Sequence, residues 1–130
     1  MRDGTIERCL RSESTRFLPR ASRQGLPRKF LVVQADRQAI ITPSHVAGAP
    51  DLMVEVLLPA TRARDLRIKA PLYCRASVLE YWALDPIAQV VIRHQLTDTQ
   101  YVVTRYGLGE TLTTALDPDQ PIAVADCFSS

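Results

Sequence analysis

Short apolar runs separated by polar turns make up most of the chain after residue 28. Runs at 30–33 and 39–42 predict two buried strands, and the longer run at 51–58 predicts a central strand that a single acid interrupts. A further strand is expected at 78–85. The spacing of these runs is therefore typical of a sheet protein.

A hairpin and one main helix complete the pattern. The alternating segments 90–96 and 101–106 flank four polar residues, which predicts two paired strands. Segment 61–76 is expected to be helical, with Thr61 as its N-cap. Pro71 lacks a backbone donor, so we expect a kink at that residue or a break into two pieces.

This order of elements predicts an α+β or mixed α/β fold, in which a mixed β-sheet is flanked by few helices. Segment 121–128 is expected to form a short closing helix. The change in pattern near residue 28 divides the chain into a basic N-terminal segment, 1–28, and one folded domain, 29–130. A chain of 130 residues with 46% apolar composition is long enough for one domain with a core.

Charge is distributed unevenly along the chain. Residues 1–29 carry eight basic and three acidic side chains, a net charge of +5, so the other 101 residues carry −3. A basic arm of this kind can bind phosphates by counterion release, or it can be a solvated, disordered tail. Poor apolar periodicity favours the disordered tail.

Composition also limits the compartment and the chemistry. No run approaches the roughly 20 apolar residues of a membrane span, and no secretory signal is recognisable, so a cytoplasmic protein without membrane contact is expected. The three cysteines are widely spaced and predict free thiols. His45 and His94 lack a nucleophile in a recognisable elbow, and no glycine-rich phosphate loop is present.

Glu55 stands where the central strand should carry a buried apolar side chain. Leu52 and Val54 point to one face of this strand, while Met53, Glu55 and Leu57 point to the other. An ionised carboxylate there needs a counter-charge, hydrogen-bond donors or a metal ion, because desolvation costs several kcal/mol. An edge strand or a structural ion pair would equally explain this residue.

Two other residues bear on the chemistry of Glu55. Asp51 shares its strand face but lies four residues earlier, roughly 13 Å away along a regular strand, so it fits a strand-entry turn better than the same metal ion. Lys69 lies on one helical stripe with Leu66 and Tyr73, from which it can lean over the strand that carries Glu55. A lysine placed there can stabilise charge on a phosphate, or it can be an ordinary snorkelling side chain.

The segments GAPDLMVEVLLPAT at 48–61 and EYWALDP at 80–86, with Lys69 and Tyr73 between them, resemble the Uma-two family of restriction endonucleases in the PD-(D/E)xK nuclease superfamily. The resemblance extends from about Phe30 to the C-terminus. It implies a restriction-endonuclease-like fold, hydrolysis of DNA phosphodiesters with Mg²⁺ and, at the family level, a homodimer. The family's acid and lysine map onto Glu55 and Lys69 as catalytic residues, and the expected metal ligands are Glu55 and Asp51.

The resemblance also marks a departure at the start of the domain. The family's Pro-Asp pair falls on Arg28 and Lys29, so a lysine replaces the first metal-binding aspartate. A cation at position 29 would repel Mg²⁺ or would neutralise Glu55. Three hypotheses follow: an active endonuclease with an unexpected second ligand such as Asp36, Asp51 or Asp85; a catalytically dead module that binds DNA or protein; and a gene whose first codons are read in the wrong frame.

Overall fold

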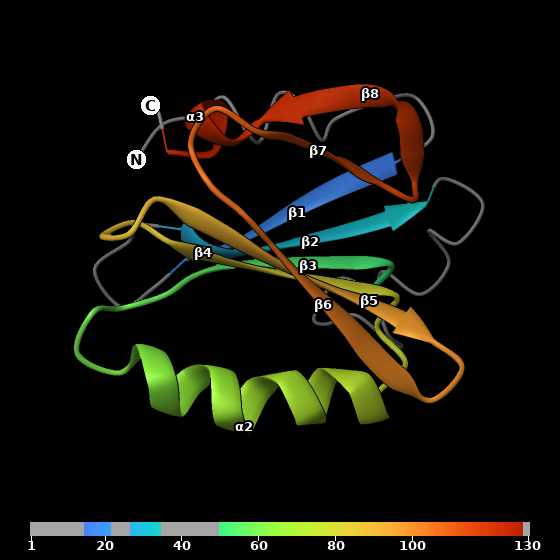
Figure 1. Ribbon diagram of the computed structural model, residues 1–130. Coiled ribbons are helices and arrows are strands. Elements are labelled where there is room, and N and C mark those ends of the chain that lie inside the picture. The colour runs from blue at the N-terminus through green and yellow to red at the C-terminus, as the bar shows by residue number, and fades with distance from the viewer. Residues whose placement is uncertain (1–14, 22–26, 35–49, 129–130) are drawn as a thin grey trace.

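The structure is a computed structural model, which describes the backbone of residues 15–21, 27–34 and 50–128 and the side chains of residues 50–128. Its main element is a six-stranded sheet whose spatial order follows the chain (Figure 1). The strands are β1 (Thr15–Ala21), β2 (Pro27–Gln34), β3 (Leu52–Val56), β4 (Glu80–Asp85), β5 (Val90–Thr97) and β6 (Gln100–Tyr106). Strands β7 (Thr111–Thr114) and β8 (Asp117–Ala123) pair with each other in a second, two-stranded sheet.

The sheet is mixed, and the main helix connects the two strands of its one parallel pair. Strands β3 and β4 pair in parallel, whereas the β1–β2, β2–β3, β4–β5 and β5–β6 pairs are antiparallel. A parallel pair needs a crossover connection, and helix α2 (Arg62–Arg75) supplies it. Figure 1 shows α2 on one face of the sheet and β7, β8 and the short helix α3 (Val124–Cys127) on the other.

Alternation along β3 and β4 gives the sheet two apolar clusters, one on each face. Leu52 and Val54 pack with Trp82 in the cluster on the β7–β8 side. Met53 and Leu57 pack in the second cluster, which Leu66 and other inward residues of α2 cover. The predicted assignment of faces on the central strand is therefore confirmed, and Trp82, with no exposed surface, is a core residue as expected.

Most of the predicted elements are confirmed. The strands expected at 30–33, 51–58 and 78–85 correspond to β2, β3 and β4, and the hairpin corresponds to β5 and β6. The strand expected at 39–42 lies outside the described residues. No helix in the described ranges is long and apolar enough to cross a membrane.

Two expectations at the ends of the chain need correction. Strand β1 lies within segment 1–28, for which disorder was predicted, so the sheet begins before the predicted domain boundary. The sequence of β1, TRFLPRA, contains no long apolar run, so the hydrophobic pattern did not predict this strand. The closing helix is confined to Val124–Cys127, since residues 117–123 form β8.

The predicted break at Pro71 is also wrong. Helix α2 is one element of 14 residues with Pro71 inside it, and Thr61 precedes it without capping the backbone through its side chain. The Thr61 hydroxyl instead donates to the Asp65 carboxylate at 2.8 Å. Proline costs one backbone hydrogen bond, but the apolar contacts of Leu66 and Tyr73 with the sheet favour a continuous helix.

Replacing Pro71 with alanine should therefore stabilise the protein. Pro71→Ala restores a donor for the carbonyl of Arg67 and removes a steric clash, which we expect to raise the free energy of unfolding by about 1–3 kcal/mol. Chemical denaturation would measure the change. Pro59→Ala is the control, because Pro59 lies in the turn before α2 and no helical hydrogen bond is gained there. Equal effects of the two substitutions would contradict this account.

Candidate active site around Glu55 and Lys69

A buried ion pair joins the central strand to the crossover helix. The Lys69 ammonium group donates to Glu55 Oε2, with Nζ and Oε2 2.9 Å apart. The Glu55 residue is only 3% exposed, whereas the Lys69 side chain retains 28% of its exposed surface. The pair thus has one desolvated end on the sheet and one end that reaches solvent.

Local geometry explains how the pair forms. The pleat of β3 directs Glu55 to the face that α2 covers, together with Met53 and Leu57. Lys69 follows Leu66 by three residues in α2, so both side chains lie on the side of the helix that faces the sheet. The expectation that Lys69 leans over Glu55 is confirmed, so residues 14 positions apart in sequence form one site.

Tyrosine side chains complete the surroundings of the Glu55 carboxylate. The Tyr81 hydroxyl donates to Glu55 Oε1 at 3.2 Å, and the ring of Tyr73 contacts that of Tyr81 edge to face at 4.9 Å. Burial, and then the charge of Glu55, raise the pKa of both tyrosines. Both phenols therefore stay protonated and act as donors at neutral pH.

The sequence pattern did not predict the contact of Tyr81 with Glu55. Register could have signalled the contact: in the parallel pair, Met53 is opposite Tyr81 and Glu55 is opposite Ala83. Residues that alternate in step on neighbouring strands share a face of the sheet. Tyr81 and Glu55 therefore belong to the same face, and the phenol is long enough to span the remaining distance.

Position 29 also lies beside the site in the backbone pairing. Lys29 is the Cα partner of Glu55 in the antiparallel β2–β3 pair. Directly opposed residues of such a pair lie on one face, with Cβ atoms roughly 5 Å apart. The position at which the family resemblance leads us to expect an aspartate therefore pairs with Glu55.

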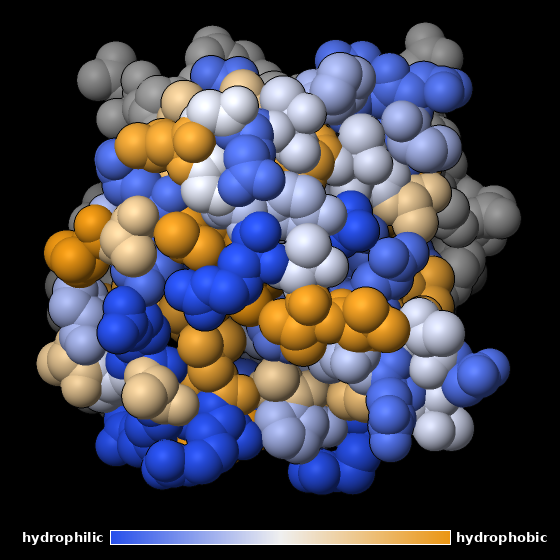
Figure 2. Space-filling view, viewed as in Figure 1, coloured by the Kyte–Doolittle hydropathy of each residue, from blue (hydrophilic) through white to orange (hydrophobic). Residues whose placement is uncertain are grey.

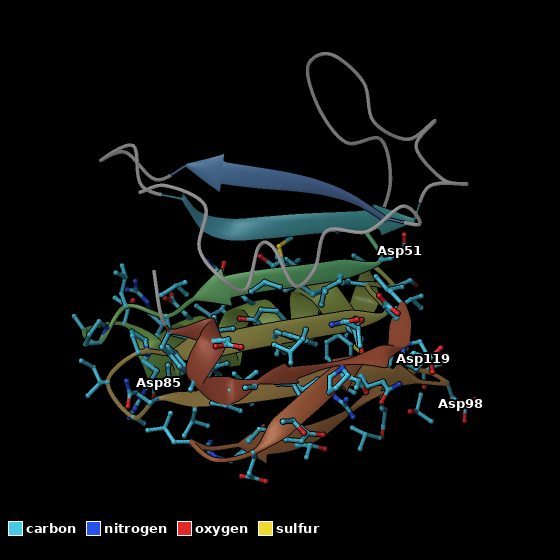
Figure 3. All side chains as sticks on the ribbon, turned by 90° about the horizontal axis from the view of Figure 1, so that it is seen from above. Asp51, Asp85, Asp98 and Asp119 are labelled. Atoms are coloured by element: carbon cyan, nitrogen blue, oxygen red, sulfur yellow. The ribbon has the colours of Figure 1, made fainter. Side chains whose placement is uncertain are left out.

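Asp51 and Asp85 were two of the residues considered as a second metal ligand beside Glu55. Figure 3 shows Asp51 and Asp85 at opposite ends of the parallel strands. Asp85 Oδ1 accepts from the backbone of Ile87 and Ala88, and Oδ2 accepts from Arg62 at 2.6 Å. Burial raises the pKa of Asp85, but these donors outweigh burial and lower it overall. Asp85 is therefore used in ending β4.

Asp51 directly precedes strand β3 and is four residues from Glu55. Along a regular strand this separation corresponds to roughly 13 Å between the two residues. Within residues 50–128, no three His, Cys, Asp or Glu side chains gather as metal ligands. Magnesium requires near-octahedral oxygen coordination, usually with one or two carboxylates. The described donor set, one carboxylate bound by an ammonium group and a phenol, does not fit that ion, and the role of Asp51 as a ligand stays a prediction.

A second buried acid, Glu80, lies on the other face of the sheet. Its carboxylate accepts from the Thr114 hydroxyl and from the Ala115 backbone at 3.1 Å. Burial raises the pKa of Glu80, and these donors only partly oppose the rise. Glu80 links β4 to the small sheet, away from Lys69, so we assign it a structural part.

The fold is of the α+β class and is similar to that of a solved nuclease-like protein. The solved structure of a putative nuclease belonging to DUF820 from Anabaena variabilis ATCC 29413 is similar, with a TM-score of 0.69 and 15% sequence identity; the match covers 95% of this chain and 74% of that one. No curated protein matches the chain. The Uma2 family model, described as "Putative restriction endonuclease", matches residues 9–125, and the chain therefore belongs to this family.

Removing the Lys69 charge should destabilise the fold, because the buried Glu55 carboxylate would lose the ammonium group that lies 2.9 Å from it. We expect Lys69→Met to lower the free energy of unfolding by about 2 kcal/mol, less than for a fully buried pair because the lysine is partly exposed. Denaturation at pH 7 would measure this. Arg67→Met, which removes an exposed cation from the same helix, should change stability by less than about 0.5 kcal/mol.

The double variant Glu55→Leu with Lys69→Met separates the charge from the packing. The double variant should recover at least half of the unfolding free energy that Lys69→Met loses, because it has no buried carboxylate that needs a counter-charge. Additive losses in this double-mutant cycle would show that the two side chains do not interact.

Proposed function

We propose that the protein acts on DNA as an endonuclease, with Glu55 and Lys69 as the residues that contact the phosphodiester and its attacking water. Membership of the family and the nuclease-like fold support the substrate class. The single observation that carries the assignment is the 2.9 Å contact between Lys69 and the buried carboxylate of Glu55.

Each residue has a distinct part in this proposal. The solvent-facing ammonium group of Lys69 stabilises negative charge that develops on a phosphate oxygen. Glu55 holds the ammonium group in place and accepts hydrogen bonds, and Tyr81 fixes the second carboxylate oxygen. Mg²⁺ is the cofactor that the family resemblance implies, but no step is assigned to it because the described donors do not fit it.

A second candidate function is a DNA-binding module that no longer hydrolyses its ligand. The pairing of Lys29 with Glu55 favours this candidate, since a base at that position opposes a divalent ion in the site. In this case the same fold would hold the DNA backbone, and the buried pair would only stabilise the domain.

Helix α2 offers a surface for the DNA backbone in either case. Arg64, Arg67 and Arg75 are exposed and recur at helical spacing along its outer side. The lower rim of the molecule, where Figure 1 places α2, is largely hydrophilic in Figure 2. From residue 64 to 75 the helix rises roughly 16 Å, enough to follow two or three successive phosphates of one strand.

Two further expectations accompany the proposal. A cytoplasmic location agrees with action on cellular DNA. A homodimer would supply two sites, one for each strand of a duplex. Size-exclusion chromatography with light scattering would report the dimer directly.

Plasmid nicking tests the enzymatic proposal. Supercoiled DNA incubated with the full chain and Mg²⁺ should be converted slowly to open circles, because Lys69 stabilises the reacting phosphate. Glu55→Gln and Lys69→Met should each lower the rate at least about 10-fold, and Asp98→Asn, an exposed turn substitution, should leave it unchanged. Equal nicking by the wild type and Glu55→Gln, with DNA binding retained, would leave only the binding module.

Substitution of the helix arginines tests the DNA surface. Arg64→Gln with Arg67→Gln should weaken binding to any duplex and reduce the slope of log K against log salt by about 2, since two phosphate contacts are lost. Arg105→Gln is the matched control, an exposed arginine on strand β6. Fluorescence anisotropy over a salt series would measure both, and equal slopes for all three proteins would contradict this placement.

A further inference from the structure

A cleft of about 300 Å³ opens between helix α2 and the β5–β6 hairpin. Its walls are mainly apolar and include Ala70, Pro71, Cys74, His94, Tyr101 and Val103. Figure 2 shows apolar surface over strand β6, where Val102 and Val103 are 56% and 54% exposed. The volume is at the lower end of the range for small-molecule sites.

His94 is the buried polar side chain of this cleft. The residue is 6% exposed, and its ring lies between two aromatic rings, stacked on Tyr81 at 4.8 Å and edge to face with Tyr101 at 5.5 Å. These contacts fix the orientation of the imidazole. The ring therefore presents the same atoms to the cleft without reorganisation.

The tautomer of His94 follows from the contact of Nδ1 with the strand backbone. Nδ1 lies 3.0 Å from the backbone oxygen of Tyr81, and a carbonyl oxygen can only accept, so Nδ1 carries the proton. Desolvation lowers the pKa of His94 and outweighs the nearby backbone carbonyls, so the ring is neutral at pH 7. Nε2 is then an acceptor, and no group in residues 50–128 donates a hydrogen bond to it.

We propose that this cleft binds a small molecule with one aromatic ring and one hydroxyl or amine donor, which donates to His94 Nε2. The apolar walls favour the ring, and the buried acceptor selects for a donor, because a ligand without one would leave Nε2 unsatisfied. The Cys74 thiol does not supply that donor, since its Sγ already donates to the Thr99 backbone oxygen at 3.4 Å.

The cleft adjoins the Glu55 site through a single side chain. Tyr81 stacks on His94 with its ring and donates to Glu55 with its hydroxyl. Tyr73, the neighbour of Cys74 in α2, contacts the same ring. A ligand that shifts His94 would therefore move a donor of Glu55, but ligand binding itself does not depend on any activity toward DNA.

Titration with phenol and toluene tests the proposal directly. The two probes have nearly the same shape, but only phenol has a donor. In ¹⁵N-correlated spectra of the full chain, phenol should produce saturable shifts at the amides of Thr99, Gln100 and Val103, with an affinity roughly 3- to 10-fold higher than that of toluene. Equal affinities, or no saturable shift with either probe, would overturn the proposal.

Two variants control for folding and for location. His94→Phe keeps an aromatic ring between Tyr81 and Tyr101 and should abolish the preference for phenol while toluene still binds. Val103→Trp, at an exposed position on the cleft wall, should block both probes and leave the dispersion of the spectrum unchanged. A retained preference in His94→Phe, or unchanged binding in Val103→Trp, would refute this site. So would a concentration-dependent dimer that fills the cleft in the wild type and is lost in Val103→Trp.

Discussion

The position of the candidate site depends on the desolvation of one carboxylate. Glu55 lies on the α2 side of the sheet, near the end of strand β3, and is itself only 3% exposed. Left alone, this charge would cost several kcal/mol, so the fold has to supply a cation and donors on the same face. Lys69 and Tyr81 supply them from two different elements. The ion pair therefore links β3, the crossover helix and β4, and any chemistry at Glu55 takes place beside a fixed ammonium group.

The period of the apolar residues was sufficient to predict much of this fold. Strands β3 to β6 and helix α2 were predicted from their apolar runs and from the spacing of their apolar residues. The same argument put Glu55 and Lys69 on facing surfaces, and their contact confirms it. Strand β1 was not predicted, because it is defined by its backbone pairing with β2 and the composition of the segment does not reveal that pairing.

Other features of the site depend on register and on tertiary contacts. The contact of Tyr81 with Glu55 depends on how β3 and β4 align, and the use of Asp85 in the turn after β4 depends on donors at 87 and 88. Pro71 was expected to kink the helix or to break it in two, and the break does not occur because packing against the sheet favours one continuous element. Lys29, where the family resemblance leads us to expect an aspartate, is the backbone partner of Glu55. Tyr81 further connects this site to the aromatic cleft on the far side of His94.

Nuclear magnetic resonance of the lysine ammonium groups tests the central contact most directly. The chain has only two lysines, Lys29 and Lys69, so the signals can be assigned with one substitution. We expect the Nζ of Lys69 to show slowed hydrogen exchange and a coupling across the hydrogen bond to the Glu55 carboxylate carbon. A Lys69 signal that exchanges as fast as that of a free side chain, without such a coupling, would contradict the account.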